Sequence, residues 1–169
     1  MKHLITAVLA AFIGFATASI ASADSHGSTG YSIKKINAGF DDVFAELKDV
    51  LINKGLVIDL VGHVDKMIER TADVTKSITE TGSKSPYKSA KYVLFCSAKL
   101  TQKAVSASPE NLGICPYIVF AYETKAEPGV TRVGYRQPIS GASRTTQKVT
   151  REVNAFLQSI IDETAAAQY

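Results

Sequence analysis

Residues 117–123 read YIVFAYE, a run of β-branched and aromatic side chains that is typical of a β-strand. Alternate residues of a strand point to opposite faces of its sheet. The two sets are Ile118, Phe120 and Tyr122 on one face, and Tyr117, Val119 and Ala121 on the other. Both faces of this strand are therefore apolar, which predicts that something covers each side of the sheet.

Further strands are predicted before and after this segment. Pro128-Gly129 is typical of a tight turn, so it predicts a hairpin that joins residues 117–123 to residues 130–136. The remaining predicted strands, each rich in β-branched or aromatic residues, cover residues 31–36, 56–61 and 91–96.

Two main helices are predicted by apolar residues at helical spacing. The first is marked by Phe40, Val43, Phe44, Leu47 and Leu51. Gly55 predicts where it stops. The second carries one apolar stripe made of Val149, Val153, Phe156, Leu157, Ile160 and Ile161. Shorter helices are predicted at about 64–78 and at 100–106, and a loop is predicted across residues 81–89.

This order of elements predicts an α+β fold. We expect a two-layer sandwich with a largely antiparallel sheet of about five strands, a β-α-β-β-β-β-α core and the two main helices on one face. Residues 31–169 then form a single domain. In such a fold no main helix covers the second face of the strand at residues 117–123. We expect a second copy of the chain to cover it, in a homodimer; the alternative cover is the middle helix at 64–78.

The first 23 residues have the pattern of a cleavable export signal. Lys2 precedes an uncharged apolar stretch from Leu4 to Ile20, and Ala21-Ser22-Ala23 supplies small side chains for a signal peptidase. An uncleaved membrane anchor is the alternative, because about 20 apolar residues can span a bilayer. The mild hydrophobicity and the lack of a following basic cluster favour cleavage. We expect a signal peptide at 1–23, a flexible N-terminus at 24–30, and a periplasmic or secreted protein without a stable membrane anchor.

The charge balance argues against nucleic acid as a partner. The chain has 19 Lys and Arg against 16 Asp and Glu, and loss of the signal removes only Lys2, which leaves 18 against 16. No long run of Lys or Arg interrupts this even balance, so neither nucleic acid nor an anionic surface is indicated.

The segment from Lys91 to Pro138 resembles the domain-of-unknown-function 302 (DUF302) family. The resemblance is carried by residues 95–100 (FCSAKL), Pro109, residues 115–123 (CPYIVFAYE) and residues 133–138 (VGYRQP). It implies a compact sandwich of the kind described above, and family members are often dimers. The family has no established common activity, so the resemblance implies no catalytic residue. It implies structural roles for Pro116, at the start of a strand, and for Gly134, at a site of close packing or a bulge.

Two departures from the family pattern are cysteines. Cys96 stands near a position where the family often has Asn-Pro, and Cys115 stands where Leu is common. They lie at the opposite ends of one connection between two predicted strands. If those strands are antiparallel neighbours, a disulfide is geometrically reasonable, and it is the expected state of two cysteines in an exported chain. A redox or metal-thiolate site and a pair of buried free thiols remain alternatives, although no Cys-x-x-Cys motif is present.

His63 and Met67 are candidates for a metal site. They stand four residues apart and share a face if a helix begins by residue 63, and with a cysteine nearby they would form a soft ligand set for copper or haem iron. A Met at helical spacing is more often part of the core, and a single His at a strand end is usually hydrogen-bonded only. No cofactor is therefore predicted.

No catalytic motif is found in the chain. G-x-S-x-G, H-E-x-x-H, G-x-G-x-x-G and the P-loop are all missing from the sequence. We expect an exported, non-catalytic binding or interaction domain that holds a small apolar ligand between its helices and sheet. The alternative is a periplasmic redox or metal accessory protein that uses Cys96, Cys115, His63 and Met67. An enzymatic role is left open without a motif to support it.

Overall fold

The computed structural model describes residues 30–75, 85–139, 141 and 143–169. The expected signal peptide at 1–23 lies outside the described residues, as does all of the expected flexible segment except Gly30. Within the described residues, no helix has both the length and the apolar character that crossing a membrane requires.

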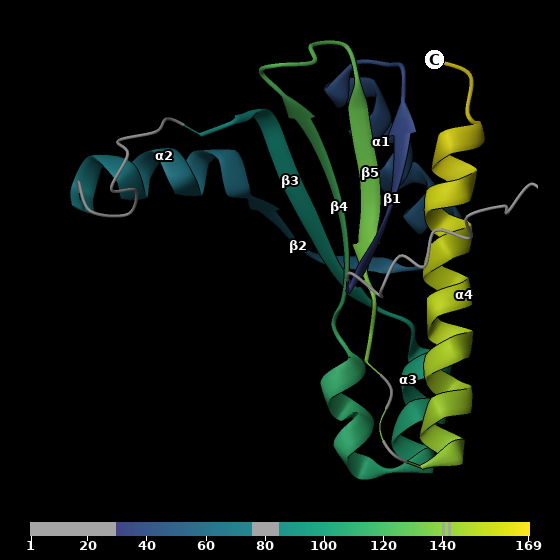
Figure 1. The fold of residues 1–169 in the computed structure, drawn as a ribbon. Coiled ribbons are helices and arrows are strands. Elements are labelled where there is room, and N and C mark those ends of the chain that lie inside the picture. The colour runs from purple at the N-terminus through teal and green to yellow at the C-terminus, as the bar shows by residue number, and fades with distance from the viewer. Residues whose placement is uncertain (1–29, 76–84, 140, 142) are drawn as a thin grey trace, which may run out of the picture.

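Five strands form one sheet in the order β1-β5-β4-β3-β2 (Figure 1). Every pair of neighbouring strands is antiparallel. The strands are β1 (Tyr31–Ile36), β2 (Val57–His63), β3 (Tyr87–Cys96), β4 (Tyr117–Thr124) and β5 (Thr131–Arg136). The helices are α1 (Phe40–Asn53), α2 (Val64–Thr75), α3 (Ala98–Ala107), a 3₁₀ helix η1 (Pro109–Ile114) and α4 (Arg144–Ala166).

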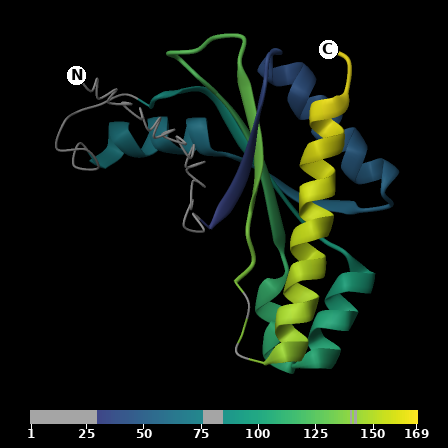
Figure 2. The same cartoon turned by 45° about the vertical axis from the view of Figure 1, so that its right-hand side comes forward.

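Helices α1 and α4 lie on the same side of the sheet, whereas α2 lies on the other side (Figure 2). The core between these two helices and the sheet is closely filled. It includes Val43, Leu47 and Leu51 of α1, Val153, Leu157 and Ile161 of α4, and Val93, Val119 and Val133 of the sheet. The predicted α+β two-layer sandwich, with a largely antiparallel five-stranded sheet, is therefore confirmed.

The end of α1 follows directly from the sequence. Gly55 has a positive φ of 71°, a conformation that costs glycine little because it has no Cβ. Its N–H donates to the carbonyl of Ile52 at 2.8 Å, and the N–H of Leu56 donates to Leu51 at 3.1 Å. These bonds satisfy carbonyls at the end of the helix and turn the chain into β2.

A buried carboxylate holds the hairpin between β4 and β5. Glu123 is 2 % exposed, and it accepts hydrogen bonds from Lys88 Nζ at 2.9 Å and from the Gly129 N–H at 2.7 Å. The Lys88 ammonium is the main reason why the pKa of Glu123 lies below its usual value, followed by the Gly129 bond. Glu123 therefore stays ionised and ties the turn at Gly129 to the strands.

Two differences from the sequence-based expectations concern α2 and β3. The segment predicted as a loop up to Ser89 is already strand from Tyr87, because Pro86 is the last residue that interrupts pairing and Tyr87 pairs with Thr124 across an irregular register. Helix α2 projects away from the sheet and does not lie across its second face (Figure 1). The middle helix is therefore not the cover for that face.

Candidate binding surface

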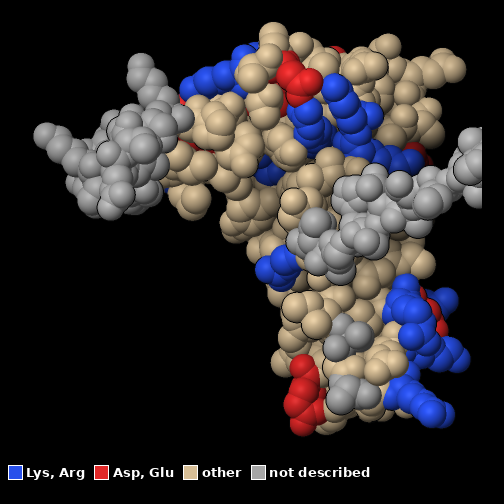
Figure 3. All heavy atoms as spheres, viewed as in Figure 1, with Lys and Arg blue, Asp and Glu red and all other residues tan. Residues whose placement is uncertain are grey.

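The second face of the sheet, which we call the open face, carries apolar side chains on β1, β2, β3 and β4, together with Lys35, Arg132 and Arg136 toward its β1 and β5 edge. It carries alternate residues of all five strands, and several of them are exposed. Tyr31 is 49 %, Ile33 37 % and Leu60 47 % exposed. In Figure 3 the surface in the angle between α2 and the sheet is mostly formed by residues other than Lys, Arg, Asp and Glu. Exposed apolar area of this kind marks an interaction surface more often than a structural feature.

Two glycines determine how the aromatic rings lie on this face. Tyr92 of β3 and Phe120 of β4 are direct cross-strand partners. A Cβ on Gly62, in β2, would lie 2.1 Å from Tyr92 Cζ, so the Tyr92 ring lies over that glycine. A Cβ on Gly134, in β5, would lie 2.8 Å from Phe120 Cζ. The two rings therefore lean apart, each toward a glycine of the next strand outward.

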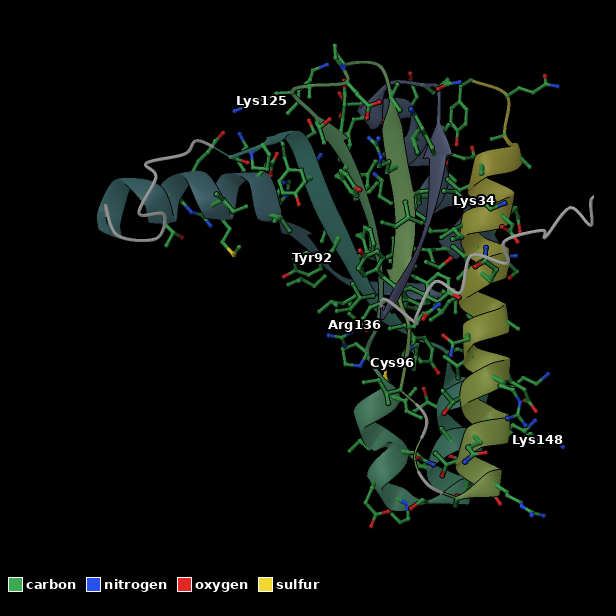
Figure 4. All side chains as sticks on the ribbon, in the orientation of Figure 1. Lys34, Tyr92, Cys96, Lys125, Arg136 and Lys148 are labelled. Carbon is green, nitrogen blue, oxygen red and sulfur yellow. A yellow bond between two sulfur atoms is a disulfide. The ribbon has the colours of Figure 1, made fainter. Side chains whose placement is uncertain are left out.

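A cavity of about 430 Å³ opens between these rings at the base of α2. Besides Tyr92 and Phe120, its lining includes Tyr87 and Tyr122, whose rings meet edge to face at 5.5 Å. Figure 4 draws Tyr92 on the opposite side of the sheet from α4. A ligand was expected between the helices and the sheet, but core side chains fill that space. The open face holds the cavity because it has no helix packed across it.

The cavity carries almost no charge. Lys91 contributes to its lining, but its Nζ lies 5.2 and 5.1 Å from the ring centroids of Phe40 and Phe44, which belong to α1 on the covered side. Burial raises the pKa of the Tyr122 hydroxyl, so this group stays protonated and neutral near pH 7. The cavity is therefore suited to uncharged groups.

A larger cavity, of about 670 Å³, lies between η1 and the segment that follows β5. It is lined by groups of opposite charge, Glu110 and Arg136, together with Asn111. The Asn111 amide already donates to the Thr146 hydroxyl at 3.1 Å, so it is engaged in holding η1 against α4. Its lining is therefore more polar and more charged than that of the cavity on the open face.

The predicted disulfide joins Cys96, at the end of β3, to Cys115, just before β4. Their Cα atoms lie 5.8 Å apart, within the usual range for a disulfide. The bridge closes the connection that contains α3 and η1, and it thereby fixes these helices at the lower end of the sheet. Figure 4 shows Cys96 at this end, close to α3.

His63 and Met67 do not join the cysteines. His63 is the last residue of β2 and pairs with Lys91, whereas Cys96 pairs with Val57 at the other end of that strand. Six residues of strand separate the two positions, which is about 20 Å. Met67 is 51 % exposed, and His63 lines a shallow cavity with Lys66 and Arg70 instead. Among the described residues, no three His, Cys, Asp or Glu side chains are grouped closely enough to hold a metal ion.

Known proteins were compared with the chain by sequence and by structure. A scan against protein-family models and a search of curated proteins returned no match. Among solved structures, the chain is similar to the crystal structure of the uncharacterized conserved protein DUF302 from Bacillus stearothermophilus, with a TM-score of 0.64 and 12 % sequence identity. That match covers 80 % of this chain and 98 % of the other.

The chain has a DUF302-like fold. At 12 % identity the likeness shows the fold alone and nothing about a ligand. Within the DUF302-like fold, Gly134 is a site of close packing, as the resemblance implied, since its missing Cβ would meet the Ser32 carbonyl oxygen at 2.3 Å. Gly62 was not among the residues expected to form a site. The sequence signal for Gly62 is a glycine inside a strand rich in β-branched residues, because such a glycine often marks a place where a neighbouring group packs closely.

Proposed function

We propose that the protein is an exported, non-catalytic binding or interaction domain that works through the open face of its sheet, and that a second copy of the chain covers this face. The observation that carries the proposal is the exposure of apolar side chains on that face, namely Tyr31, Ile33 and Leu60. The export pattern of residues 1–23 supports a periplasmic or secreted location, and a disulfide is compatible with it.

The size of the open face is near the lower limit for a stable dimer. Five strands spaced about 4.8 Å apart and about 20 Å long present roughly 500 Å² per copy. Two copies would then bury about 1,000 Å² in total, which a specific interface should at least reach. We therefore expect a homodimer whose dissociation is measurable by dilution.

Sedimentation velocity of residues 24–169 between about 1 and 100 µM tests this proposal. The wild-type protein should sediment as a dimer at the upper concentrations. Ile33→Glu places a charge on the open face and should give monomers, because burying an unpaired carboxylate is costly. Ile52→Glu is the matched control, since Ile52 is 58 % exposed on α1, away from this face. A wild-type monomer at 100 µM, or equal dissociation by both variants, would contradict the dimer.

The redox or metal alternative has less support from the geometry. It requires Cys96, Cys115, His63 and Met67 to act together, and the register of β2 and β3 places His63 at the opposite end of the sheet from the disulfide. Metal that remains bound through purification and is lost in His63→Ala would favour this alternative over the interaction domain.

A further inference from the structure

We propose that the cavity between the Tyr92 and Phe120 rings is a binding site for a planar, uncharged aromatic molecule. The proposal deepens the proposed function, because it rests on the open face being the working surface of the domain. It does not require a second copy of the chain, since the cavity is formed by β3, β4 and the first turn of α2 within one chain.

The shape of the cavity favours a flat ligand. Side chains that stand directly opposite each other on antiparallel strands are about 5 Å apart at Cβ, so two aromatic rings in such a pair normally pack against each other. Here Tyr92 lies over Gly62, and Phe120 lies against Gly134. The space between them is a slot with an aromatic ring on each side, and an inserted flat ring can contact both.

The ends of the slot are also set by residue size. Ala90 pairs with Tyr122 toward one end of the slot, and Leu94 pairs with Ile118 toward the other. The small Ala90 side chain leaves depth beneath Tyr87 and Tyr122, whereas Leu94 and Ile118 supply aliphatic contact. A volume of about 430 Å³ is within the range of pockets that hold small organic ligands.

The charge of the lining favours a neutral ligand. The Lys91 ammonium is directed to Phe40 and Phe44 on the covered side, and therefore offers no partner to an anion in the slot. Two arginines of β5 lie near the slot without forming part of its lining. The Arg132 guanidinium lies 5.9 Å from the Tyr122 ring and is paired with Glu127. Arg136 is exposed on the same face of the sheet as Tyr92 (Figure 4). An anionic ligand inside the slot would lose its hydration without gaining a cation from the lining, which is unfavourable.

Binding of the neutral fluorophore N-phenyl-1-naphthylamine to the mature protein tests the site. The wild-type protein should bind one molecule per chain with a saturable rise in fluorescence. In Gly62→Ala the new Cβ would overlap the Tyr92 ring and push it into the slot, so affinity should fall at least tenfold. Gly113→Ala is the matched control, because a Cβ at Gly113 meets nothing within 4 Å, and its affinity should equal that of the wild type.

A second variant fills the slot from the end at Leu94 and Ile118. It keeps the test decisive if Gly62→Ala does not fold. Leu94→Trp adds volume beside Ile118 without altering either glycine, and it should also weaken binding at least tenfold while circular dichroism remains that of the wild type. The anionic analogue 8-anilinonaphthalene-1-sulfonate should bind at least tenfold more weakly than the neutral probe. No saturable binding to the wild type, undiminished binding to both slot variants, or equal affinity for the two probes overturns the proposal.

The outcomes for the ligand and for the dimer are separable. A wild-type protein that binds the neutral probe at the slot but sediments as a monomer keeps the ligand site and removes the second copy from the open face. Probe binding is measured at a concentration at which the protein sediments as a monomer, because a second copy on the open face would cover the slot. A protein that does not bind the probe under these conditions but dimerises at higher concentration removes the ligand site and keeps the homodimer.

Discussion

At the scale of single residues, Glu123 is buried while it keeps its charge. Its carboxylate is 2 % exposed and depends on Lys88 and the Gly129 N–H for its partners. Because its pKa is lowered in the folded state, Glu123 binds protons more weakly there than in the unfolded chain. Its contribution to stability is therefore fully present above about pH 4.5, and it is lost as the pH falls through the lower pKa of the folded state.

We predict that Glu123→Gln lowers the free energy of unfolding at pH 7 by about 1–3 kcal/mol, the usual loss when a charged, buried hydrogen-bonding group is removed. The variant should also lose less stability than the wild type between pH 6 and pH 3. Urea unfolding across this range measures both effects. Glu69→Gln, an exposed change on α2, is the control and should follow the wild type. If the free energy of unfolding depends on pH in the same way for Glu123→Gln and for the wild type, Lys88 and the Gly129 N–H do not lower the pKa of Glu123.

The Cys96–Cys115 disulfide makes a second residue-scale prediction. Closing a loop of 19 residues should stabilise the fold by about 3 kcal/mol in the chain-entropy model. The double variant Cys96→Ser, Cys115→Ser should therefore unfold at a lower urea concentration than the oxidised wild type. Its free energy of unfolding should be lower by about 3 kcal/mol. The reduced wild type should match the variant, and the oxidised wild type should be about 2 Da lighter than the reduced form. Equal stability of oxidised and reduced protein would indicate that the bridge does not constrain the unfolded chain.

At the scale of elements, Gly134 links β5 to its neighbours on both sides. A Cβ there would meet the Ser32 carbonyl oxygen of β1 at 2.3 Å and the Phe120 ring of β4 at 2.8 Å. The backbone atom cannot move without shifting β1. We predict that Gly134→Ala lowers the free energy of unfolding by about 1–3 kcal/mol, the usual cost of overpacking.

Urea unfolding of Gly134→Ala and of Gly113→Ala measures this loss of stability, because the two variants make the same substitution at a packed and at an open position. Gly113→Ala should stay within about 0.5 kcal/mol of the wild type, as surface substitutions usually do. If both glycine variants lose equal stability, the close packing of β1 on Gly134 is not the cause.

The strand at residues 87–96 shows why element boundaries are harder to predict than element types. The apolar run at residues 91–96 predicted a strand, and Gly82, Pro86 and several polar residues predicted a loop up to Ser89. The structure extends β3 back to Tyr87 because β4 continues to Thr124 and offers partners for these residues. Pairing with a distant strand thus overrides a locally polar sequence. Local composition does not indicate which distant strand will supply that pairing.

At the scale of the whole molecule, the export signal gives a prediction of its own. Signal peptidases accept only small side chains immediately before the cleaved bond. Expression of the full chain in a bacterium with a secretion pathway should yield a mature protein that begins at Asp24. Ala23→Leu should leave the precursor uncleaved, whereas Ala11→Leu, within the apolar stretch, should still be processed. Intact mass distinguishes the forms, and a wild-type chain that retains residues 1–23 would contradict the prediction.

Helical spacing and strand composition are local signals, so they predicted the two-layer α+β class and the positions of the two main helices. The chain has two cysteines, which leaves one possible intrachain pairing, and the structure contains it. The sequence also indicated that one strand is apolar on both faces. The folded structure alone shows that α2 projects from the sheet and that Tyr92 and Phe120 lean apart over glycines of neighbouring strands. Gly62 pairs with Tyr92 across about 30 residues of chain. Side-chain directions on a sheet depend on which strands become neighbours, and that information arises only when distant segments pair.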